Sequence, residues 1–214
     1  MASRILKRGS LGDIRCETDA AGSRIVREFA SSRWRWLARY LASREARALE
    51  RVATIDGLPR LLASDRDHLT RSYLAGQPLH LASPLPPAYF RDALRLLRRL
   101  HRAGVAHNDL AKEANWICSA NGMPGIVDFQ LSFCFDRRTR WFRLLAREDL
   151  RHLLKHKRHY RPETITARQR AILETPMWPA RWWRRWVKPV YLRLTRGLLG
   201  WPERDGAAER QRPE

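Results

Sequence analysis

The hydrophobic positions in the first third of the chain alternate as in strands and then recur as in a helix. The segment Ser23-Arg24-Ile25-Val26-Arg27-Glu28-Phe29 alternates in polarity, which predicts part of a strand. Between residues 34 and 52, apolar side chains return every three or four positions, as an amphipathic helix requires: Leu37, Tyr40, Leu41, Ala48, Leu49 and Val52. Two short apolar pieces flank the polar residues 64–67, which suits a hairpin. A small sheet with one helix is therefore expected.

The middle of the chain has a different texture, with helices around short extended pieces. A Pro-rich stretch at 83–87 precedes a predicted helix whose apolar face holds Phe90, Ala93, Leu94, Leu97 and Leu100, and Gly104 lies where a glycine often follows a helix. Residues 105–107, 116–118 and 125–129 are short extended candidates, with a hairpin turn at Asn121-Gly122. A further helix is expected over about 141–156, and Thr166 and Gln169 form a capping box that opens another.

The charge of the chain points to an anionic partner. Of its 214 residues, 42 are Lys or Arg and 22 are Asp or Glu, which leaves a net charge of +20. Such an excess favours binding to a nucleotide, a nucleic acid, a phosphorylated sugar or a lipid surface. The 3 cysteines are far apart, which argues against a disulfide framework, and no apolar run is long enough to span a membrane. A cytoplasmic protein is expected.

Two acidic motifs carry the candidate chemistry. His107-Asn108-Asp109 follows the helix at 90–100 and precedes the predicted hairpin, and Asp128-Phe129-Gln130 follows that hairpin. In order and context these motifs resemble the H-R-D and D-F-G motifs of the protein-kinase superfamily. The resemblance implies an α+β, reduced bilobal protein-kinase-like fold that binds ATP and Mg²⁺. It also implies that Asp109 orients and deprotonates the acceptor hydroxyl and that Asp128 holds Mg²⁺.

The same resemblance assigns two more residues near Asp109. Asn115 would be the second metal ligand, and Lys112 would contact the γ-phosphate. Five residues separate Asp109 from Asn115, whereas the usual pattern has four. A one-residue bulge would absorb the difference.

The N-terminal third also resembles a kinase nucleotide-binding lobe, with one substitution. Ser72, Tyr73 and Leu74 resemble the hinge whose backbone binds adenine, and Glu45 lies where the family has a helix glutamate. Arg27 takes the place of the family's strand lysine, a change of both shape and hydrogen-bonding pattern. A weak phosphate-loop candidate contains Gly9 and Gly12, and an ordinary turn explains it equally well.

Two interpretations of the substitution remain open. Arg27 would either pair with Glu45 and clamp phosphate bidentately, or fill the nucleotide site of a pseudokinase that acts as a binding or scaffold module on an anionic partner. Because both acidic motifs are present, the active enzyme is favoured. Asp149 resembles an aspartate that braces the catalytic loop, and a surface ion pair is its alternative.

The short chain after Asp128 leaves no room for a peptide-binding platform or a long activation segment. This reduction resembles the RIO-type atypical serine/threonine kinases and the bacterial lipopolysaccharide-core sugar (Kdo/heptose) kinases. The acceptor implied is a hydroxyl on a protein or on a glycolipid, because the same site chemistry serves either.

Three parts of the chain are expected: an N-lobe at 1–75, a C-lobe at 76–176, and a basic Trp/Arg-rich helix with a tail at 177–214. Residues 177–201 combine Trp with Arg and Lys and hold no acid. That pattern fits either an interfacial helix on the anionic inner face of a membrane or a helix packed on the C-lobe. Nucleic-acid binding is a weaker alternative for the charge, since no known motif accompanies it.

Overall fold

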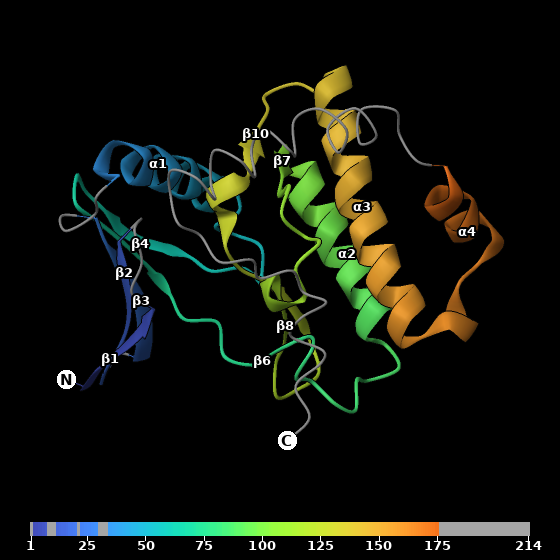
Figure 1. Ribbon diagram of the computed structural model, residues 1–214, viewed down its shortest axis with the longest axis horizontal. Helices are drawn as coiled ribbons and strands as arrows, with labels where there is room; N and C mark the ends of the chain where they lie inside the picture. The colour runs from blue at the N-terminus through green and yellow to red at the C-terminus, as the bar shows by residue number, and fades with distance from the viewer. Residues whose placement is uncertain (1, 8–11, 21, 30–33, 176–214) are drawn as a thin grey trace. The chain divides into compact units, whose positions relative to one another are not determined.

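The computed structural model describes residues 2–7, 12–20, 22–29 and 34–175 (Figure 1). The chain forms two compact units, Met1–Leu153 and Leu154–Glu214. The predicted division at residues 75 and 176 stays a prediction. Within the described residues, no helix is long and apolar enough to cross a membrane. The predicted Trp/Arg-rich helix at 177–201 lies outside the described residues.

An antiparallel sheet of 5 strands, in the order β1-β2-β3-β5-β4, opens the first unit. Its strands are β1 (Ala2–Lys7), β2 (Asp13–Asp19), β3 (Gly22–Glu28), β4 (Leu61–Ser64) and β5 (His68–Ser72). The strand predicted around Ile25 is β3, and the predicted hairpin is β4–β5. Ile25 pairs with Arg71 and Arg27 pairs with Leu69 across β3 and β5, so these four side chains share one face of the sheet.

Helix α1 (Arg35–Arg51) packs on the sheet through small residues. Its buried positions are Ala38, Ala42, Glu45, Ala46, Ala48 and Leu49, and three of these alanines join Phe29 and Leu69 in one core cluster. The predicted helix is confirmed, but Tyr40, placed on its apolar face, is 54% exposed. The alanines account for this difference, because they allow close approach to the sheet while the larger side chain points outward.

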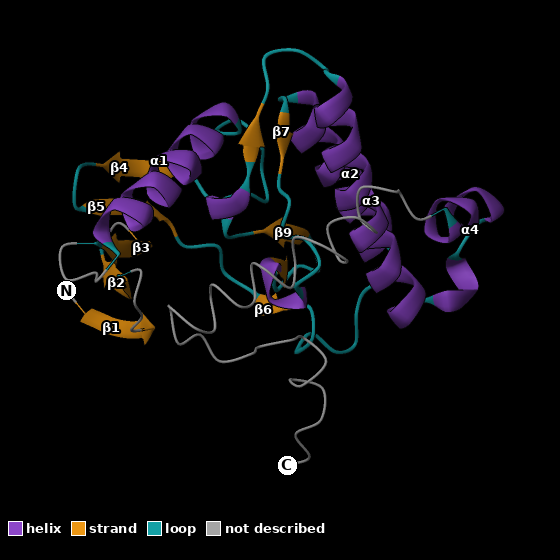
Figure 2. Cartoon of the chain, turned by 45° about the horizontal axis from the view of Figure 1, so that its top comes forward, coloured by secondary structure: helices purple, strands orange, loops and turns teal. Residues whose placement is uncertain are grey.

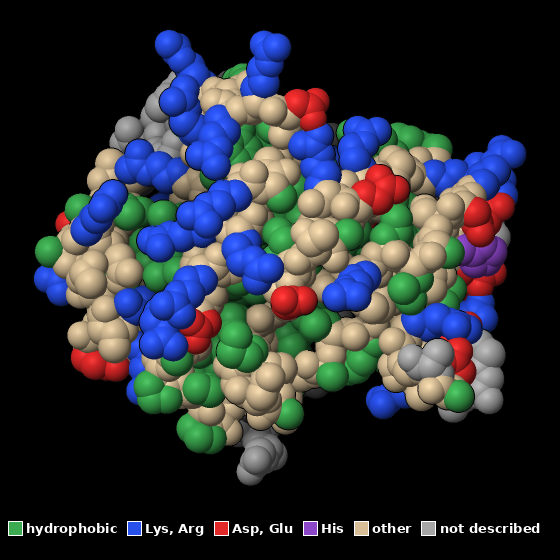
Figure 3. Space-filling view, turned by 180° about the vertical axis from the view of Figure 1, so that it is seen from behind, with side chains coloured by type: hydrophobic (Ala, Val, Ile, Leu, Met, Phe, Trp, Pro, Cys, Tyr) green, Lys and Arg blue, Asp and Glu red, His purple; other side chains and the backbone are tan. Residues whose placement is uncertain are grey.

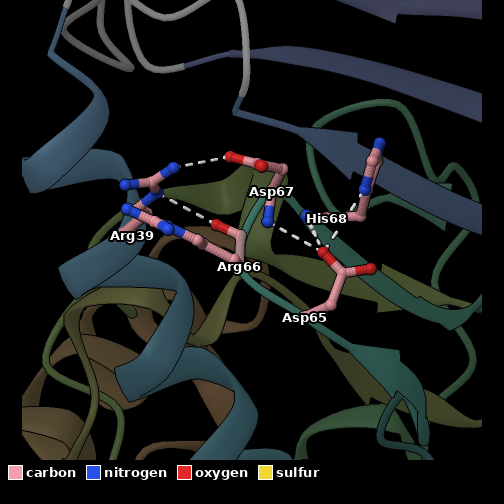
Figure 4. Close-up of polar contacts among 5 residues, drawn as sticks. All are labelled: Arg39, Asp65, Arg66, Asp67 and His68. Atoms are coloured by element: carbon pink, nitrogen blue, oxygen red, sulfur yellow. Dashed lines mark hydrogen bonds and ion pairs between the residues drawn. The ribbon is translucent and has the colours of Figure 1, made fainter.

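The β4–β5 turn is tied to α1 by polar contacts (Figure 4). The Asp65 carboxylate accepts the backbone N–H groups of Asp67 and His68, both at 2.8 Å, and these bonds lower the pKa of Asp65. From α1, Arg39 donates to the Asp67 carboxylate at 2.7 Å and to the Arg66 carbonyl at 3.0 Å. The polar run that predicted the turn therefore also anchors the helix.

The rest of the first unit is helical around short strands (Figures 1 and 2). Strands β6 (Gln77–Pro78), β8 (Trp116–Cys118) and β9 (Pro124–Ile126) form an antiparallel sheet, and β7 (Val105–Ala106) pairs with β10 (Phe133–Cys134). Helix α2 (Tyr89–Arg102) buries the predicted Phe90, Ala93, Leu97 and Leu100, and it ends before Gly104, whose φ is +76°. Short 3-10 helices η1 (Glu113–Asn115) and η2 (Phe129–Leu131) follow β7 and β9.

Helix α3 (Arg140–Tyr160) begins in the first unit and continues into the second. The second unit then contains a 3-10 turn, η3 (Pro162–Thr164), and α4 (Ala167–Glu174). The capping box predicted at Thr166 and Gln169 is present in both directions. The α+β fold predicted from the sequence is confirmed. One strand estimate is too long, because β9 ends at Ile126 and Phe129 begins η2.

Candidate active site

A buried carboxylate from α3 holds the segment His107-Asn108-Asp109. The two oxygens of Asp149 accept the backbone N–H groups of His107 and Asn108, each at 2.8 Å, and its side chain is 1% exposed. Nε2 of His101 lies 3.1 Å from the same carboxylate. Asp149 is therefore the brace of this loop, and the alternative of a surface ion pair is wrong.

His107 joins this loop to the segment that carries Asp128. Its Nε2 donates to the Val127 carbonyl at 3.0 Å, and its ring packs edge-on against Phe129 with centroids 4.7 Å apart. Burial lowers the pKa of His107, so the neutral ring is favoured. The side chain acts as a spacer in the core between the two acidic motifs.

Asp109, Lys112 and Asn115 are brought together despite the extra residue between them. Lys112 donates to the Asp109 carboxylate at 2.7 Å, and the Asn115 amide donates to the same oxygen at 3.1 Å and to the Asp109 carbonyl at 2.9 Å. The 3-10 helix η1 ends at Asn115, whose side chain reaches back to Asp109, and the predicted one-residue bulge stays a prediction.

Opposing effects act on the Asp109 carboxyl. Loss of water contact raises its pKa most, Lys112 opposes that rise, and the negative charge of Asp128 adds to it. The net direction is upward. Asp128 is thus close enough to Asp109 to raise the pKa of the Asp109 carboxyl.

Asp128 stands in a strained backbone position just after β9. Its φ is +68° and ψ +70°, the left-handed region, which a residue with a side chain adopts at a cost. Gln130 donates to its Oδ1 at 2.6 Å, and the neighbouring Val127 N–H donates to the Asn115 carbonyl at 3.0 Å. Asn115 and Asp128 therefore lie at the same end of the β8–β9 hairpin.

On the inner face of the N-terminal sheet, one carboxylate lies between two arginines. Glu45 of α1, 2% exposed, lies 3.4 Å from Nη1 of Arg27 and 3.2 Å from Nε of Arg71. Burial raises the pKa of Glu45 most, while Arg71 and then Arg27 lower it. The expected Arg27–Glu45 pair is present. Arg71 is an addition that the sequence interpretation missed, although its alternation with Leu69 along β5 places it on this face.

Of the three residues that resemble a kinase hinge, Ser72 and Tyr73 already use their backbone N–H groups for hydrogen bonds within the protein. The N–H of Ser72 donates to the Arg60 carbonyl at 2.9 Å, and the N–H of Tyr73 donates to the Ser23 carbonyl at 3.1 Å. An adenine ring would therefore depend on the Leu74 amide or on backbone carbonyls.

Gly12 has a structural reason for its identity. Its φ is +107°, and a Cβ there would collide with the Glu28 carbonyl. Gly9, the other member of the predicted phosphate loop, lies outside the described residues.

The side-chain oxygens at this site would bind Mg²⁺ only together with phosphate oxygens. Among the described residues, no group of 3 or more His, Cys, Asp or Glu side chains is arranged to hold a metal ion. Mg²⁺ commonly binds through one or two carboxylates together with substrate phosphates and water. Asp128 with the Asn115 amide oxygen fits that second kind of site.

Solved structures share this architecture. The Rio2 kinase of Chaetomium thermophilum in complex with ADP, Mg²⁺ and phosphoaspartate aligns with a TM-score of 0.60 and 18% identity, over 81% of this chain and 60% of that chain. A second Rio2 kinase structure from this organism aligns with a TM-score of 0.59 and 20% identity, over 81% and 62% of the two chains. The chain has a RIO-type, protein-kinase-like fold.

The RIO-type fold is supported by structure rather than by sequence likeness. No family model matches the chain, and no curated protein matches it in sequence. The chain spans about 60% of the length of the Rio2 chains. At these identities the likeness establishes the fold alone, and the roles of the site residues stay predictions.

The Asp149 brace predicts a local effect of removing one acceptor. In Asp149→Asn, an amide –NH₂ replaces an oxygen that accepts a loop N–H, which should cost about 1–3 kcal/mol. Hydrogen exchange at the His107 and Asn108 amides should accelerate more than elsewhere. Asp92→Asn is the control, because Asp92 accepts only from exposed Arg91 and Arg95. Uniform acceleration across the chain would contradict a specific brace.

The raised pKa of Asp109 predicts the pH dependence of stability. Because its pKa is higher in the folded than in the unfolded chain, the folded state holds the proton more tightly, so stability falls as pH rises between the two values. Asp109→Asn removes that loss. The free energy of unfolding of Asp109→Asn minus that of the native chain should therefore increase as pH rises between the two pKa values, and it should stay constant at higher pH. Denaturant titration at several pH values measures this difference. A difference constant with pH would show that burial does not raise the pKa of Asp109.

Proposed function

We propose that the chain is an ATP- and Mg²⁺-dependent phosphotransferase that moves the γ-phosphate to a hydroxyl acceptor. The observation that carries the proposal is the convergence of Asp109, Lys112 and Asn115 by direct hydrogen bonds, with Asp128 at the adjoining end of the β8–β9 hairpin. Asp128 and Asn115 would hold Mg²⁺, which, when bound with ATP, supplies positive charge over the β and γ phosphates.

Side chains of the protein would take up the proton of the acceptor hydroxyl and neutralise charge on the transferred phosphoryl group. The acceptor oxygen forms its bond to the γ-phosphorus while the bond from that phosphorus to the β–γ bridging oxygen breaks, and ADP leaves. The acceptor proton passes to the Asp109 carboxylate, whose raised pKa favours taking it. Lys112, half exposed and already beside Asp109, would neutralise charge on the moving phosphoryl group.

The Arg27–Glu45–Arg71 cluster would bind the phosphates nearer the nucleoside. Two arginines share one carboxylate, so the cluster keeps an excess positive charge on the inner face of the sheet. Nε of Arg27 is buried with no hydrogen-bond partner among the described residues. The Nε–H of an arginine in this state can donate a hydrogen bond to a phosphate oxygen. The cluster supports retention of nucleotide binding when Arg27 replaces the usual lysine.

The acceptor is proposed as a serine or threonine hydroxyl, as in a RIO-type kinase, with a lipid-linked sugar hydroxyl as the alternative. The fold similarity favours the first, and the basic composition permits the second. Cytoplasmic location and peripheral binding to an anionic membrane through 177–201 remain predictions.

One observation favours a non-catalytic binding module. Both acidic side chains already have partners: Gln130 occupies one oxygen of Asp128, and Lys112 occupies one of Asp109. A pseudokinase would keep these contacts when nucleotide binds.

Nucleotide binding is predicted to stabilise the chain in a metal-dependent manner. ATP at about 100 times its Kd adds about 2.7 kcal/mol, which for a chain of this size raises Tm by roughly 5–10 °C. The shift should be larger with Mg²⁺ than with a chelator, and Asp128→Asn should remove that difference while Asp92→Asn keeps it. A shift equal in both conditions for the native chain would contradict the metal site.

Phosphoryl transfer is predicted to need Asp109. The native chain should transfer labelled γ-phosphate from ATP into a cell lysate, and Asp109→Asn should lower the rate by about 10²–10⁴-fold. A hydroxyl acceptor gives a phosphate ester that survives hydroxylamine, whereas a carboxylate acceptor gives an acyl phosphate that hydroxylamine cleaves. Protease and organic extraction then separate protein from glycolipid products. ATP binding without transfer would support the binding module instead.

A further inference from the structure

Four arginines line a pocket at one end of β7, and the segment His107-Asn108-Asp109 follows the other end. The pocket has a volume of about 290 Å³, and Arg51, Arg102, Arg137 and Arg138 surround it together with Asp136. Gly104 lies at the end of β7 that enters from α2, whereas His107 follows its other end. None of the proposed nucleotide, metal or catalytic residues lines the pocket, so it is separate from the candidate active site.

The backbone makes room for these side chains at Gly104. Its φ of +76° ends α2 sharply, and its carbonyl accepts the Phe135 N–H at 2.8 Å. A Cβ at this position would collide with the Phe135 carbonyl. That carbonyl instead accepts a hydrogen bond from Arg51 of α1 at 2.8 Å, so three segments distant in sequence meet around the pocket.

The charges in this pocket are unbalanced. Arg51 pairs with Asp136, the one carboxylate that lines it. Arg102, Arg137 and Arg138 are exposed, and within the described part of the chain no ion pair joins any of them to a carboxylate. Figure 3 shows many Lys and Arg side chains on the face that it draws, with scattered Asp and Glu between them. Uncompensated arginines around a hollow repel one another until an anion enters.

We propose that this pocket is a second anion site, which binds a phosphate-bearing small molecule. Guanidinium groups donate in a planar fork that matches phosphate oxygens, and several arginines together favour phosphate over a single carboxylate. The volume lies just below the roughly 300–1,000 Å³ typical of ligand pockets. It therefore suits one or two phosphate groups with little attached rather than an extended nucleic acid. The ligand would contact both α1 and the segment that follows Asp128.

Inorganic pyrophosphate is the probe, titrated by calorimetry into the full chain at about 0.15 M salt, where exposed charges more than about 8 Å apart are largely screened. The variant Arg102→Gln/Arg137→Gln/Arg138→Gln should weaken binding by at least about tenfold. The matched control Arg4→Gln/Arg35→Gln/Arg98→Gln removes the same charge from exposed positions outside the pocket and should bind as the native chain does. In Arg27→Gln, the binding that the pocket triple variant removes should remain, which separates this site from the candidate active site.

Three results would overturn the site. Pyrophosphate could fail to bind, the pocket and control variants could weaken binding equally, or Arg27→Gln could abolish it. Equal weakening would mean that the charge acts diffusely, and loss in Arg27→Gln would place pyrophosphate at the nucleotide cluster. The pocket variant should keep its thermal stabilisation by ATP and Mg²⁺, which shows that it is folded. If that stabilisation fails in the native chain as well, the proposed function fails and the pyrophosphate result still decides the pocket.

A second variant tests the pocket in the opposite direction. Asp136→Asn removes the competing carboxylate and frees Arg51, whose bond to the Phe135 carbonyl remains, so pyrophosphate should bind more tightly. Asp56→Asn is the control, since Asp56 is also an exposed carboxylate near an arginine, Arg60, at 3.9 Å. Unchanged or weaker binding in Asp136→Asn, or an equal gain in Asp56→Asn, would contradict the site.

Discussion

The candidate active site depends on one buried carboxylate, Asp149, which belongs to neither acidic motif. Its two oxygens satisfy the consecutive N–H groups of His107 and Asn108. Asn108 has a φ of +64°, a position that the chain keeps only when its surroundings fix it. Because this turn is fixed, the Asp109 carboxylate lies beside Lys112 and Asn115. The side chain of His107 then reaches the Val127 carbonyl, so the same brace also positions the segment that carries Asp128.

Helix α1 is attached to the segment after Asp128 at two points. Arg44 donates to the carbonyls of Leu131 at 3.0 Å and Ser132 at 2.8 Å, and it lies over the Phe133 ring at 4.0 Å. Two turns further along, Arg51 binds the Phe135 carbonyl and the Asp136 carboxylate. Kinases regulated through a long activation segment order this region by adding a charged group. In this protein, arginines of α1 bind backbone carbonyls of that segment, and these contacts fix the helix that carries Glu45.

The sequence predicted the helices and strands well, because they are encoded locally. Periodicity located α1, α2, β3 and the β4–β5 hairpin, and the capping residues located α4. The exposure of Tyr40 could not be predicted, since it depends on how closely an alanine-rich helix approaches a sheet. Arg71 was missed for a related reason, because its partner Glu45 lies far away in the sequence, on α1, and only the packing of α1 against the sheet brings the two together. The differences between prediction and structure therefore lie in side-chain contacts between elements, not in the helices and strands themselves.

The use of arginine on the inner face of the sheet bears on whether the site binds an anion. A buried lysine can lose its proton to escape the cost of burial, whereas arginine stays charged. Arg27 and Arg71 are 12% and 16% exposed, and Glu45 compensates only one of the two charges. A site that had merely been filled by a side chain would be more stable with one arginine and one carboxylate, because a second buried cation has to be desolvated while it shares that carboxylate. The excess charge therefore supports the proposal that phosphates complete the cluster.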